Sequence, residues 1–72
     1  MSFDYSKLRG KIKEKCKTQE AFAAQLCISP TSLSEKLNNK SDFSHGEIVL
    51  ACEKLDIPIS AVSDYFFAPK VK

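Results

Sequence analysis

The sequence predicts an all-α fold of five short helices built around a helix-turn-helix. Apolar residues recur at helical spacing along most of the 72 residues. The expected helix starts also repeat the hydrophobic-staple motif, in which one apolar residue precedes the capping residue and another lies on the first turn of the helix. Ile57 and Ile59 are β-branched, but Pro58 between them argues against a strand.

The first helix is expected to follow Asp4, whose side chain can cap it, with Phe3 and Leu8 forming a hydrophobic staple. Its inward stripe recurs every four residues, at Leu8, Ile12 and Cys16. Cations crowd the same segment, at Lys7, Arg9, Lys11, Lys13, Lys15 and Lys17. The sequence leaves open whether these cations face DNA, a protein or solvent.

Two further helices follow in close succession. Thr18 opens a second helix that runs through Leu26, and Ser29 caps a third helix that ends near Asn38. Pro30 suits the first turn of the third helix because that position needs no amide hydrogen.

The spacing of these two helices predicts a helix-turn-helix over about residues 18–38. Ala23 stands where the helices would cross, and Ile28 and Leu33 can fill the space between them. Cys27 occupies the turn, where glycine is common because it adopts a left-handed backbone. A positive φ at Cys27 would cost on the order of 1 kcal/mol.

The fourth helix begins with the capping box formed by Ser44 and Glu47 and extends to about Leu55. Pro58 marks the start of a short fifth helix. The inward residues are expected at Ile48, Ala51, Cys52 and Leu55 of the fourth helix and at Val62, Tyr65 and Phe66 of the fifth. The tail from Ala68 to Lys72 is expected to be loose.

Composition indicates one globular domain covering residues 1–72, with 43% hydrophobic and 28% charged residues. There is no apolar run of the roughly 20 residues that a membrane span needs and no secretory signal, so a cytoplasmic location is expected.

The three cysteines, Cys16, Cys27 and Cys52, lack metal-ligand spacing and are interpreted as reduced, mostly buried thiols. The lone His45 is expected at the surface. We expect no enzyme activity, metal, cofactor, membrane partner or small-molecule substrate.

The exposed face of the third helix is the candidate for base recognition. If Leu33 and Leu37 are buried, helical spacing places short polar side chains on the opposite face and its flanks, at Thr31, Ser32, Ser34, Glu35 and Asn38. Candidates for phosphate contact are Gln19, Ser29, Lys36, Asn39 and Lys40. Glu35 would either accept from cytosine or pair with Lys36 or Lys40. The alternative is that all of these are simply solvated polar residues.

The segment TQEAFAAQLCISPTSLSEKLNN, residues 18–39, resembles the Cro and phage-repressor class of helix-turn-helix proteins, and the likeness extends through Ser44 to Glu47 and Leu55 to Val62. FDYSKLRGKI at residues 3–12, KLNNK at 36–40 and DYFF at 64–67 resemble the small modulator-of-repression proteins of temperate phages from Gram-positive bacteria. The resemblance implies a five-helix lambda-repressor-like fold. It also implies base contacts from the positions of Pro30, Thr31 and Glu35, and phosphate contacts from Gln19 and residues 38–40.

Two functions follow from these observations. The first is a phage transcription regulator whose third helix binds double-stranded operator DNA at a lysogeny/lysis switch and blocks competitors. It would act as a dimer because one module of this size buries little surface. The alternative is a modulator, co-repressor or antirepressor, that acts through a partner phage repressor. The net charge of only +2, the apolar Pro30 and the acidic Glu35 favour the alternative. Cooperative binding of both proteins to DNA would satisfy both hypotheses.

Overall fold

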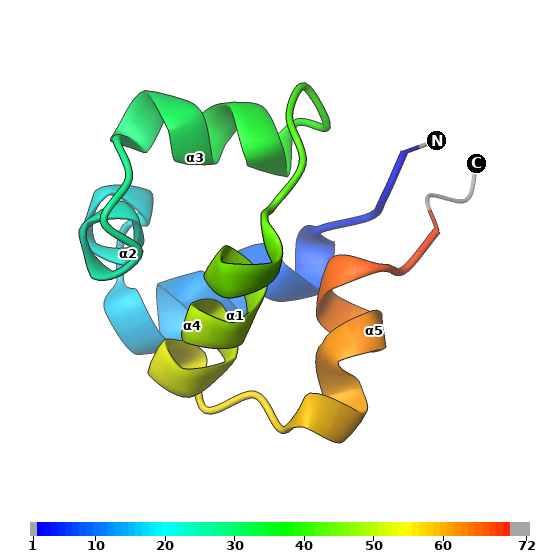
Figure 1. Ribbon diagram of the computed structural model, residues 1–72. Coiled ribbons are helices and arrows are strands. Elements are labelled where there is room, and N and C mark those ends of the chain that lie inside the picture. Colours follow the sequence, from blue (N-terminus) through cyan, green and yellow to red (C-terminus); the bar gives the residue numbers. More distant parts are fainter. Residues whose placement is uncertain (1, 70–72) are drawn as a thin grey trace.

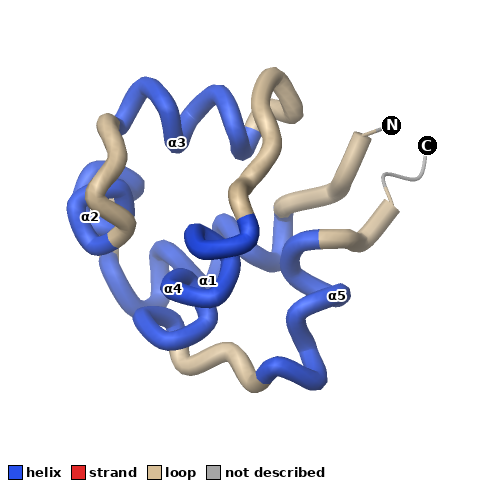
Figure 2. Tube along the Cα trace, in the orientation of Figure 1, coloured by secondary structure: helices blue, strands red, loops and turns tan. Residues whose placement is uncertain are grey.

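Five α-helices and one 3₁₀-helix make up the fold, in a computed structural model that describes residues 2–69. In chain order these are α1 (Ser6–Cys16), α2 (Gln19–Gln25), α3 (Pro30–Leu37), α4 (His45–Leu55), the 3₁₀-helix η1 (Ile59–Ala61) and α5 (Val62–Phe66). Helix α1 contacts α2, α4 and α5, while α2 and α3 pack against each other (Figure 1). No strand occurs in residues 2–69 (Figure 2). The predicted all-helical fold of five short helices is confirmed.

Hydroxyl caps begin α2, α3 and α4 as the sequence predicts. The side-chain oxygens of Thr18, Ser29 and Ser44 each accept a hydrogen bond of 3.1 Å from the backbone N–H three residues later. The carboxylate of Glu47 in turn accepts from the Ser44 N–H at 2.8 Å, which completes the predicted capping box. These caps satisfy amide hydrogens that have no partner within the helix.

The start of α1 differs from the prediction. Tyr5 is the N-cap residue and provides no side-chain hydrogen bond, whereas Asp4 lies one residue earlier and its Oδ1 accepts from the Ser6 N–H at 2.9 Å. The helix starts one residue later than expected because the Tyr5 carbonyl accepts the first bond of the helical ladder, from the Arg9 N–H at 2.8 Å. The Asp4 N–H instead donates to the Ala68 carbonyl at 2.8 Å, next to an isolated antiparallel bridge between Phe3 and Pro69.

The same pairing corrects the prediction of a loose tail. Ala68 and Pro69 are held by their contacts with Asp4 and Phe3, so the prediction is wrong for these two residues. Its remaining part, residues 70–72, lies outside the described residues.

One hydrophobic core joins all five α-helices. Its largest fully buried side chains are Phe22, Phe66, Leu8, Ile12, Leu33 and Leu55. The predicted inward residues Ile48, Val62 and Tyr65 are only half-buried and pack at the edge of this core. Cys52 is buried and Cys16 half-buried, but Cys27 is exposed, so the prediction of mostly buried thiols is wrong for Cys27. The side chain of Cys27 faces out because its residue forms the turn.

Four helices end in a residue with positive φ that is not glycine. Lys17, Cys27, Asn39 and Asp56 follow α1 to α4 with φ of 72°, 60°, 63° and 56°. The residues that follow Cys27, Asn39 and Asp56 each donate their N–H to the carbonyl five residues earlier in the chain, at 3.0, 2.8 and 2.9 Å. This is the Schellman pattern, which satisfies carbonyls at a helix end. Cys27 therefore has the left-handed backbone that is typical of this turn position.

Candidate functional site

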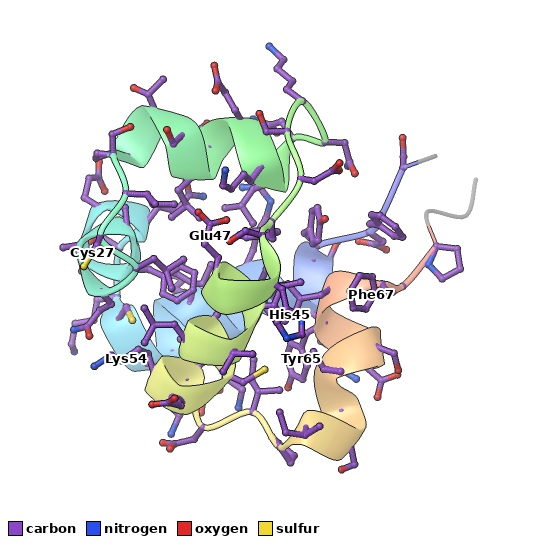
Figure 3. All side chains as sticks on the ribbon, in the orientation of Figure 1. Cys27, His45, Glu47, Lys54, Tyr65 and Phe67 are labelled. Atoms are coloured by element: carbon purple, nitrogen blue, oxygen red, sulfur yellow. The ribbon has the colours of Figure 1, made fainter. Side chains whose placement is uncertain are left out.

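The candidate site is a groove formed by α2 and α3. The two helices lie close together because Ala23, only 1% exposed, leaves little side chain between them, and Leu33 is fully buried. Residues 26–29 form the turn between the helices, and its Ile28 N–H donates to the Ala23 carbonyl at 3.0 Å. This turn fixes how α3 lies on α2, with Cys27 at its outer edge (Figure 3).

A surface hollow of about 490 Å³, hereafter the groove, follows the outer side of these two helices. It is lined by Gln19, Glu20, Pro30, Thr31, Ser34, Glu35, Asn38 and Lys40. Six of these are candidates for base or phosphate contact from the sequence pattern, and a seventh, Pro30, is a position where the resemblance alone implies a base contact. The structure therefore brings these six candidates together on one surface, although their role in DNA contact stays a prediction.

The four other predicted site residues do not line the groove. Ser29 and Ser32 bond to each other through their hydroxyls at 3.1 Å, within the cap of α3. The amide of Asn39 binds the Phe3 backbone twice, accepting from its N–H at 2.8 Å and donating to its carbonyl at 3.0 Å. The ammonium of Lys36 lies 3.7 Å from Glu47 Oε1.

The Lys36–Glu47 ion pair joins α3 to α4 and is largely shielded from solvent, with side chains 15% and 19% exposed. Figure 3 shows Glu47 between the two helices. Lys36 therefore points away from the groove, and it does not pair with Glu35, as one hypothesis had it. Glu35 has no ion-pair partner among residues 2–69.

Arg9 is a residue that the sequence analysis did not assign to the site. Its Nη2 donates to the Leu37 carbonyl at 3.3 Å and to Asn38 Oδ1 at 3.1 Å, at the C-terminal end of α3 where a cation is favourable. The other side of the Asn38 amide donates to Ser34 Oγ at 3.4 Å. Nothing local predicts the contact between Arg9 and Leu37, because 28 residues separate them.

Carboxylates outnumber cations in the groove. Glu20 and Glu35 contribute two negative charges and Lys40 one positive charge, so the lining has a formal net charge of −1. Neither carboxylate forms an ion pair within residues 2–69. Such a surface attracts cationic groups and repels phosphates.

The six cations of α1 and its end have different neighbours. Lys11 pairs with Glu14 at 3.7 Å, Lys15 pairs with Asp56 at 3.4 Å, and Lys7 lies 5.6 Å from the ring centroid of Tyr65. The other three cations, Arg9, Lys13 and Lys17, line a second hollow of about 260 Å³. Ile12, Thr18 and Gln19 complete its lining. The charge that the sequence crowds into one segment is thus divided among several surfaces.

The pKa values of Tyr5 and Cys52 are shifted, and both residues lie outside the groove. Burial raises the pKa of the Tyr5 phenol, and the nearby Asp42 carboxylate raises it further. Burial also raises the pKa of the Cys52 thiol. Both groups are therefore protonated at neutral pH.

Within residues 2–69, no group of three or more His, Cys, Asp or Glu side chains is arranged to hold a metal ion. In the same residues, no helix is long and apolar enough to span a membrane.

The fold and the groove define a small all-helical protein with a charged surface between its second and third helices. The chain belongs to the DUF739 family, described as proteins of unknown function, whose family model matches residues 1–69. No curated protein matches the chain.

A solved structure is similar to the whole chain. It is the solution structure of the modulator of repression (MOR) of the temperate bacteriophage TP901-1 from Lactococcus lactis, with a TM-score of 0.81 and 43% sequence identity. The match covers 100% of this chain and 97% of that one. The predicted resemblance to modulator-of-repression proteins is thus confirmed, whereas membership of the wider Cro and phage-repressor class stays a prediction.

Proposed function

We propose that this protein is a phage regulator that binds a partner repressor through the α2–α3 groove and thereby changes the affinity of that repressor for DNA. The observation that carries the proposal is the acidic lining of the groove, in which Glu20 and Glu35 form no ion pair with any residue from 2 to 69. The similarity to a phage modulator of repression supports it. In this account α2, the turn and α3 form a helix-turn-helix whose exposed side chains contact protein.

A repressor must present a basic surface to the phosphates of its operator. The groove offers carboxylates to such a surface, so a modulator seated there would compete with DNA for the same cations. Charge complementarity of this kind favours encounter and selects the partner.

Autonomous reading of operator DNA is less well supported by the same residues. Pro30 has no polar group for a base, and the Asn38 amide already contacts Arg9 and Ser34. Lys36 and Asn39, two of the expected phosphate contacts, are engaged with Glu47 and the Phe3 backbone. Binding DNA through these side chains would require these internal contacts to break.

The test compares two ligands over a range of salt concentrations: duplex DNA from the switch region, and the purified repressor encoded in the same phage genome. We expect the protein alone to bind DNA weakly and without sequence preference, and Thr31→Ala to leave that binding unchanged. Binding to the repressor should weaken about tenfold or more in Glu35→Lys, because the substitution places a cation opposite the basic surface.

Tight, sequence-specific binding to the duplex that is lost in Thr31→Ala would contradict the proposal and restore direct operator recognition. Absence of any binding to the repressor would also contradict it. Glu53→Lys, which changes the same charge on the exposed part of α4, is the matched control.

A further inference from the structure

The hollow lined by Arg9, Lys13 and Lys17, hereafter the basic hollow, presents three cations side by side. They are spaced four residues apart and therefore follow one side of α1 to its end. None of the three has a carboxylate partner within residues 2–69, whereas Lys11 and Lys15 do. The hollow therefore gathers three cations that lack a carboxylate partner in the described part of the chain, of which Arg9 also donates hydrogen bonds to the Leu37 carbonyl and to Asn38 Oδ1.

The basic hollow and the groove are neighbours. Gln19, at the first turn of α2, lines both of them. A typical protein interface covers about 800 Å² on each partner. Such an interface would take up about a sixth of the 4659 Å² accessible surface of this protein, so a partner seated on the groove can extend past Gln19 onto the basic hollow.

We infer that the repressor that occupies the groove also covers the basic hollow and places carboxylates against Arg9, Lys13 and Lys17. This inference rests on the proposed function and specifies its partner further: the partner surface carries cations opposite Glu20 and Glu35 and acidic side chains beside them. Burial of cations in an interface without a counter-charge is unfavourable, so a protein that covers the hollow is expected to supply carboxylates.

A nucleic acid fits this pair of surfaces less well. Its phosphates carry charge of one sign along the whole backbone. They would be attracted to the basic hollow and repelled by the adjoining groove. A protein can place opposite charges side by side, and such a surface would match both halves.

The test is the affinity of Lys13→Glu for the purified repressor encoded in the same phage genome, measured at low and at physiological ionic strength. Lys54→Glu is the matched control, because Lys54 also lies in the last turn of its helix, is exposed, and lines none of the hollows described above (Figure 3). Lys13→Glu should keep the fold, since the new carboxylate would stand four residues from both Arg9 and Lys17.

We expect Lys13→Glu to weaken repressor binding about tenfold and to reduce its salt dependence, while Lys54→Glu changes the affinity less than about twofold. Equal effects of the two substitutions would overturn the inference and leave the groove as the whole interface. Loss of binding to bare duplex DNA, with unchanged affinity for the repressor, would also overturn it and make the hollow a phosphate site. If the unsubstituted protein fails to bind the repressor, the proposed function itself is wrong.

Discussion

Single residues with left-handed backbone define how this chain changes direction. None of the four positive-φ residues that end α1 to α4 is glycine, and the two glycines of the chain lie inside helices α1 and α4. Asn39 and Asp56 belong to the residue types that tolerate this conformation, whereas Lys17 and Cys27 do not. The turn between α2 and α3, next to the candidate site, therefore carries backbone strain at Cys27.

Cys27→Gly should stabilise the protein, because glycine has no Cβ and loses the strain of the positive φ. The gain is expected to be roughly 0.5–1 kcal/mol, since the greater freedom of glycine in the unfolded chain offsets part of it. Urea denaturation of Cys27→Gly against Cys27→Ala checks this, because alanine removes the thiol and keeps the strain. A glycine variant no more stable than the alanine variant would contradict the account of the turn.

Contacts between helices fix the site more than the helices themselves do. The caps at Thr18, Ser29 and Ser44 were predictable because each joins residues only three apart. The contacts of Arg9 with Leu37 and of Asn39 with Phe3 were not, since they join residues 28 and 36 apart. Sequence spacing therefore located the exposed face of α3, but it could not tell which of its polar side chains were already occupied.

Glu47 shows how one side chain serves two elements, since its carboxylate caps α4 and pairs with Lys36 of α3. Glu47→Gln can keep the capping box and loses the charge of the ion pair, whereas Glu47→Ala loses both. We expect Glu47→Ala to lower the free energy of unfolding by about 1 kcal/mol more than Glu47→Gln, measured by chemical denaturation. Equal losses in the two variants would show that the hydrogen bond from the Ser44 N–H to the side chain of residue 47 contributes nothing to stability.

At the scale of the whole molecule, opposite charges are sorted onto neighbouring surfaces. The net charge of +2 conceals an acidic groove and a basic hollow that meet at Gln19. Composition could not reveal this, because Glu20 and Glu35 come together only when α2 and α3 pack, and Lys36 is drawn away to Glu47. The pairing of Phe3 with Pro69 likewise closes the two ends of the described chain on each other.

If the α2–α3 groove is the surface that binds a partner repressor, the contact can be mapped residue by residue. Nuclear magnetic resonance of the isotope-labelled protein, during titration with the repressor encoded in the same phage genome, provides this map. We expect the largest shifts in amide resonances to fall on Gln19, Glu20 and residues 31–40, with little change in α5. Shifts concentrated on α5 and Phe67, with the groove unaffected, would contradict the proposed contact.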